Sequence, residues 1–152
     1  MSRKTLTALL AGASMLLATG AFAVDTIISK DAPDLASVRA KIKAKDFKAA
    51  IAELTPLLDT HQHADVYNLL GFSQRKSGDY KQAATFYAKA LDFDANHKGA
   101  LEYQGEMYVE LGQTDKAKAN LARLVVLCPS GCEEREDLEK AIASAPAKAK
   151  VN

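Results

Sequence analysis

The feature that most constrains this chain is an internal repeat with a period of 34 residues. Residues 64–97 can be placed over residues 98–131 without a gap, and the small residues then recur in register. The matching pairs are Gly71 with Gly105, Gly78 with Gly112, and Ala83 with Ala117. Self-similarity at such a period is typical of arrays in which each repeat is one supersecondary unit and neighbouring units stack to bury a shared core.

Within each repeat the sequence predicts two helices joined by a short turn. Gly78 falls between two stretches with apolar residues at helical spacing. A glycine at such a turn can adopt a positive φ without the steric cost that a Cβ atom would add. Asp79 can cap the following helix, with Gln82 three residues later completing a capping box. We expect Gly71 and Ala83 to lie on facing helices, where small side chains let the backbones approach.

This pattern resembles the tetratricopeptide repeat. The residues that carry the resemblance in the first repeat are Tyr67, Leu70, Gly71, Gly78, Asp79, Tyr80, Ala83, Tyr87, Ala90 and Leu91. In the second they are Leu101, Gly105, Tyr108, Leu111, Gly112, Ala117, Leu121 and Pro129, and residues 101–132 also look like exported bacterial members of the family. The repeats depart from the family pattern at Ala95 and Gln104, where proline and a large apolar residue are usual. The resemblance implies an all-α fold, an α-solenoid of antiparallel helix pairs.

The flanking segments predict further helices. Residues 46–50 are similar to residues 79–83, which begin the second helix of the first repeat. We expect the turn before residue 46 to be one residue shorter than the turn before residue 79, and it lacks glycine. Pro56 should kink or split the helix that follows. The predicted organisation is a signal peptide over 1–23, a linker and degenerate helix pair over 24–63, repeats over 64–97 and 98–131, a capping helix over 132–145 and a flexible tail over 146–152.

The start of the chain predicts export. Arg3 and Lys4 precede an apolar stretch, and Ala21-Phe22-Ala23 supplies the small-x-small pattern that signal peptidase cuts. We expect cleavage after Ala23 and a periplasmic protein with no membrane span. Removal of residues 1–23 takes away two basic residues and no acidic one, which changes the formal net charge from +1 to −1. That balance gives no support for nucleic-acid binding.

Cys128 and Cys132 flank Pro-Ser-Gly at the junction between the last repeat and the capping helix. In an oxidising compartment we expect them to form a disulfide that pins the capping helix. The alternative is a metal-handling or thiol-redox protein centred on this pair, although the spacing is not Cys-x-x-Cys. The three histidines show no metal-ligand spacing, so we expect no metal and no cofactor.

The most informative surface feature is an acidic stripe, Glu102, Glu106 and Glu110, spaced four residues apart on one helical face. The simpler interpretation is a solvated face paired with nearby basic side chains; the alternative is a surface that binds a basic partner. The family resemblance implies that first helices line a concave groove. The groove-facing residues would be Asp65, Asn68, Phe72, Arg75 and Lys76 in one repeat and Gly99, Glu102, Glu106, Val109 and Glu110 in the next.

The sequence contains no Gly-rich phosphate loop, nucleophile elbow or His-Glu-x-x-His motif, which argues against an enzyme. The predicted function is a periplasmic scaffold that binds another protein or peptide, one with a basic segment, in the groove. Phe72 would be an exposed aromatic anchor there. Self-association is a further possibility that the sequence leaves open.

Overall fold

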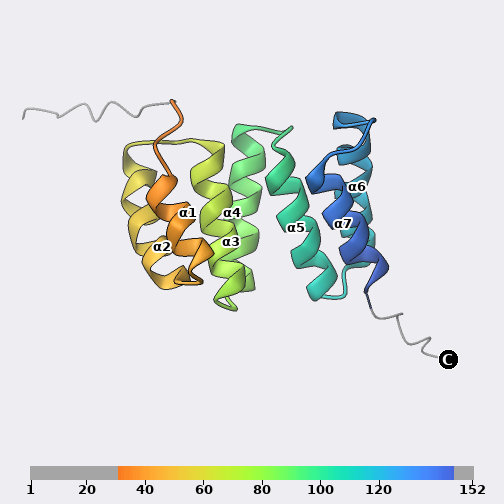
Figure 1. Ribbon diagram of the computed structural model, residues 1–152, viewed down its shortest axis with the longest axis horizontal. Helices are drawn as coiled ribbons and strands as arrows, with labels where there is room; N and C mark the ends of the chain where they lie inside the picture. Colours follow the sequence, from red (N-terminus) through yellow and green to blue (C-terminus); the bar gives the residue numbers. More distant parts are fainter. Residues whose placement is uncertain (1–30, 146–152) are drawn as a thin grey trace, which may run out of the picture.

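The computed structural model describes residues 31–145, and these form seven α-helices and one 3-10 helix without a strand. In chain order they are α1 (Ala36–Lys43), α2 (Phe47–Leu54), η1 (Thr55–Asp59), α3 (Ala64–Lys76), α4 (Tyr80–Phe93), α5 (Lys98–Glu110), α6 (Thr114–Leu127) and α7 (Glu133–Ala143). The predicted signal peptide, 1–23, and tail, 146–152, lie outside the described residues. The helices pack as neighbouring antiparallel pairs, α1 with α2, α3 with α4 and α5 with α6, and α7 covers the last pair (Figure 1). The predicted α-solenoid with a capping helix is confirmed.

Turn and cap residues explain where the repeat helices begin and end. Gly78 and Gly112 adopt φ of 89° and 68°, values that favour glycine, between the two helices of each repeat. The Asp79 carboxylate accepts a hydrogen bond from the backbone N–H of Gln82 and caps α4. At the starts of α3 and α5, the rings of His63 and His97 accept hydrogen bonds from backbone N–H groups and act as caps.

The first helix pair follows the same plan without glycine. The prediction of a shorter turn was wrong, because three residues, 44–46, separate α1 from α2 just as 77–79 separate α3 from α4. Lys45 takes the place of Gly78 and adopts φ of 61°. The turn therefore keeps its length at the cost of left-handed strain in a lysine. The predicted effect of Pro56 is confirmed, since α2 ends at Leu54 and the chain continues as η1.

The core runs along the stack and depends on close approaches at two glycines. A Cβ atom on Gly71 would lie 2.7 Å from the Tyr87 ring, which therefore fills the space beside this glycine. Tyr87 lies on α4, one helical turn after Ala83, the residue expected to face Gly71. A Cβ atom on Gly105 would lie 2.6 Å from Leu138 of α7. Leu138 is fully buried against the α5–α6 pair, as expected for a helix that closes the open end of the stack.

Candidate functional site

The ten residues predicted to face the groove lie on α3 and α5. Helices α1, α3, α5 and α7 form one side of the stack, the inner face, while α2, α4 and α6 lie behind them (Figure 1). Two hollows open on the inner face between α3, α5 and α7. Eight of the ten residues line one of these two hollows, and the other two, Phe72 and Arg75, join α3 to α5 through aromatic and ionic contacts.

Arg75 is the centre of the inner face. Its side chain is only 1% exposed, and Nη2 lies 2.5 Å from Oε2 of Glu106 while Nη1 lies 3.4 Å from Oε1 of Glu110. The guanidinium also lies 5.6 Å from the centre of the Phe72 ring and 5.9 Å from that of Tyr103. Two of the three glutamates of the acidic stripe are therefore paired within the chain and tie α5 to α3.

Phe72 is half-buried rather than exposed, because it belongs to an aromatic cluster. Its ring centre lies 4.8 Å from that of Tyr103 and 6.2 Å from that of Phe47. Lys76 is exposed, and its Nζ lies 5.4 Å from the centre of the Phe72 ring. The cluster was not predicted as a unit. Phe47 and Tyr103 lie on the helix pairs on either side of the pair that carries Phe72, and no regular spacing in the sequence connects the three residues.

The first hollow, which we call the acidic hollow, has about 310 Å³ of open space. Its lining residues are Arg39, Asp65, Asn68, Leu69, His97, Gly99, Glu102, Tyr103, Glu133, Glu134 and Asp137. Asp65, Asn68, Gly99 and Glu102 were predicted to face the groove, whereas the three acidic residues of α7 were not. The acidic start of α7 was the available signal, but it also suits the positive end of a helix dipole and does not by itself indicate a groove.

Glu102 is the most enclosed carboxyl group of the hollow. Burial raises the pKa of Glu102 to about 8, and the nearby carboxylates of Glu106, Asp137 and Glu134 add to the effect. At neutral pH this side chain is therefore mostly uncharged. Asn68 is equally enclosed, and its buried Oδ1 has no hydrogen-bond partner among residues 31–145.

The second hollow, the Val109 hollow, lies toward the C-terminal ends of α3, α5 and α7 and has about 410 Å³ of open space. Its lining residues are Lys76, Glu106, Val109, Glu110, Gly112, Ala141, Ser144 and Ala145. The inner face thus carries an open hollow near each end of the helices, with Arg75 and the aromatic cluster between them.

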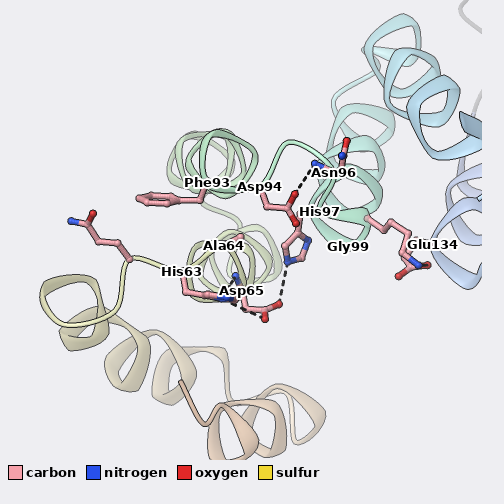
Figure 2. A pocket seen from close by; sticks show the side chains of 11 residues that line it. His63, Ala64, Asp65, Phe93, Asp94, Asn96, His97, Gly99 and Glu134 are labelled. Carbon is pink, nitrogen blue, oxygen red and sulfur yellow. Dashed lines mark hydrogen bonds and ion pairs between the residues drawn. The ribbon is translucent and has the colours of Figure 1, made fainter. Parts of the chain in front are cut away.

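A third hollow, of about 680 Å³, opens where α3 and α5 begin (Figure 2). Nδ1 of His97 accepts from the N–H of Ala100, so Nε2 carries the proton that is donated to Oδ1 of Asp65 at 3.1 Å. Figure 2 shows this pair beside Gly99, with Glu134 on the α7 side. Asp65, His97, Gly99 and Glu134 also line the acidic hollow, so the two hollows adjoin.

Two segments of the chain match known family models. Residues 64–97 and residues 100–130 each match a model described as Tetratricopeptide repeat. The chain belongs to the tetratricopeptide repeat family. No curated protein matches the chain. The first match spans the α3–α4 pair and the turn after it, and the second begins two residues into α5 and runs through α6 into the loop that follows.

Tetratricopeptide repeats are protein-interaction modules, and in general they act as scaffolds rather than as enzymes. In this tetratricopeptide repeat protein the inner face is extended by the flanking helices α1 and α7. Helix α1 contributes Arg39 to the lining of the acidic hollow, and α7 contributes Glu133, Glu134 and Asp137. The two matched repeats therefore account for only part of the surface available to a partner.

The predicted disulfide of the tetratricopeptide repeat protein is present. Cys128 and Cys132 are joined, with Cα atoms 6.0 Å apart, across the loop between α6 and α7. The bond closes a short loop next to the wall that α7 adds to the acidic hollow. Among the described residues, no three His, Cys, Asp or Glu side chains are grouped so as to hold a metal ion. No helix within 31–145 is long and apolar enough to cross a bilayer.

Proposed function

We propose that the chain is a periplasmic scaffold that holds a segment of a partner polypeptide along the inner face of the stack. The observation that carries the proposal is the placement of two open hollows on that face, lined by residues of α1, α3, α5 and α7. Polypeptide ligands need alternating pockets and polar contacts along an extended surface, which helical repeats supply. Arg75 and its glutamates, by contrast, are paired internally and hold the surface in shape.

Site-specific photo-crosslinking tests the groove. A photoreactive phenylalanine analogue at position 109 would face the partner, because Val109 lines the second hollow. The matched control is position 126 on α6, where Val126 is 78% exposed on the outer side of the stack. We expect a discrete crosslinked adduct from position 109 and none from position 126. Equal adducts at both positions, or an adduct only from position 126, would contradict the groove.

Location is tested separately. The proposal of a periplasmic protein rests on the basic and apolar start of the chain and on the disulfide, a bond that is rare in reducing compartments. Mass spectrometry of protein released by osmotic shock should give a chain that begins at Val24. Recovery of the uncleaved chain with the cytoplasmic fraction would refute this part of the proposal.

A further inference from the structure

We propose that the acidic hollow is a pocket for one cationic side chain of the partner, an arginine, which is held by the side chains of Asn68 and Glu102 and by the carboxylates of α7. The inference rests on the proposed function, because it names the chemistry of a partner segment bound to the inner face. It makes a separate prediction about one hollow on that face.

Two enclosed side chains of the hollow lack partners within the described chain, and one of them, Asn68, presents a fully buried acceptor. Asn68 is 5% exposed, lines the hollow, and its Oδ1 has no hydrogen-bond partner in the described part of the chain. Glu102 is 7% exposed and likewise makes no hydrogen bond or ion pair with residues 31–145. Buried polar groups are nearly always hydrogen-bonded in folded proteins. The open Oδ1 of Asn68 in a surface hollow therefore points to a donor that comes from outside, and the Glu102 carboxyl group lies in the same hollow.

The charges around Glu102 favour a cation. Its own helix supplies Glu106, which is held by Arg75 of α3, and α7 supplies Glu133, Glu134 and Asp137. The cationic and histidine side chains nearby contact other acidic residues. Arg39 of α1 and His97 both contact Asp65. Lys98 contacts Glu134, and Lys140 contacts Asp137. Glu102 is the enclosed carboxyl group of the hollow that none of these cations reaches.

An arginine fits this arrangement better than a metal ion. The acceptors are spread over α3, α5 and α7, and no three acidic or histidine side chains in residues 31–145 are grouped for metal binding. A guanidinium group presents five N–H donors in one plane and can reach separate carboxylates at once. It can also stack on an aromatic ring, and Tyr103 lines the same hollow.

Binding by this route is linked to a proton. Because burial and the neighbouring carboxylates raise the pKa of Glu102 to about 8, the group must lose a proton before it pairs with a cation. The ionised fraction rises about fivefold between pH 7 and pH 8 and about tenfold between pH 7 and pH 9 for such a pKa. Arginine affinity should rise by the same factors, since the guanidinium itself does not titrate in this range.

The test uses a blocked peptide, acetyl-Gly-Ser-Arg-Ser-Gly-amide, and its citrulline counterpart, which has the same shape without the charge. Titration of the full-length mature chain is followed by amide chemical shifts at low salt and at pH 7, 8 and 9. We expect shifts that map to the acidic hollow, affinity for the arginine peptide that rises about tenfold from pH 7 to pH 9, and at least tenfold weaker binding of the citrulline peptide at pH 9.

Two variants sharpen the result. Glu102→Gln should abolish the rise in affinity with pH, whereas Glu136→Gln, an equal change of charge at an exposed position on α7 outside the hollow, should leave it within about twofold. Equal affinity for both peptides, or a pH profile that Glu102→Gln does not alter, would overturn the inference. If the peptide titration fails but the crosslink at position 109 still forms, the arginine pocket is refuted and the proposed scaffold function stands. If the arginine peptide binds but no crosslinked adduct forms, the proposed scaffold function is refuted and the pocket stands.

Discussion

The substitution Glu102→Gln should stabilise the folded chain, and only at neutral and alkaline pH. In the folded state the pKa of Glu102 is raised from 4.5 to about 8, so the folded chain binds a proton that the unfolded chain has already lost. Stability therefore falls as pH rises from about 4.5 to 8 and is level above that range. One pKa unit corresponds to about 1.4 kcal/mol. The full cost of ionising Glu102 at pH 8 and above would then be about 5 kcal/mol.

The hollow is open to water, so we expect the glutamine to recover a little over half of this cost, about 3 kcal/mol at pH 8.5. Near pH 5 the glutamate is itself protonated in the folded state, and the two chains should differ by less than about 0.5 kcal/mol. Urea unfolding followed by circular dichroism at pH 5, 7 and 8.5 measures the difference, with Glu136→Gln as the exposed control. A difference that is the same at every pH would refute the reasoning about the hollow.

The remaining predictions concern the scaffold around the hollow. A double-mutant cycle with Arg75→Met and Glu106→Gln should give a coupling of about 2 kcal/mol in urea unfolding, since the pair is buried on the arginine side; a value under about 0.5 kcal/mol would contradict that. Lys45→Gly should stabilise the chain by about 0.5–1 kcal/mol, because glycine relieves the left-handed strain, and a lower melting temperature would count against it. Reduction of the bond between Cys128 and Cys132 should cost about 2 kcal/mol, the loop entropy for a separation of 4 residues, and should raise amide exchange first in α7; uniform exchange would argue against a local role.

The structure changes how the acidic stripe should be probed. Reversing the charge of Glu102, Glu106 and Glu110 together looks like a clean binding test, because the three glutamates share one helical face. Glu106 and Glu110, however, neutralise a buried arginine, so their reversal would place like charges beside it and destabilise the fold. Only Glu102 can be changed as a test of binding with the fold preserved.

The helix pairs, their turns and the capping helix could be predicted because their determinants are local. Gly78 with Asp79 defines one turn and cap within two residues, and the 34-residue period implies that the same unit is built again. Pro56 marked the end of α2 for the same reason, since the lack of an N–H acts on its own helix. The exception was Lys45, where a left-handed residue stands in for glycine and no local signal shows it.

What the sequence by itself determined is the stack and the face on which Asn68 and Glu102 lie, because side-chain direction along a helix follows from its period. What only the tertiary structure decided is the state of those side chains. Whether a carboxyl group is paired, exposed or enclosed depends on which neighbouring helix covers it. Here the contacts that decide it join residues far apart in the sequence, such as Arg75 with Glu106, 31 positions away, and with Glu110, 35 positions away. Burial and ion pairing are properties of this packing, so the same glutamate spacing produces two anchors of the fold and one enclosed acid.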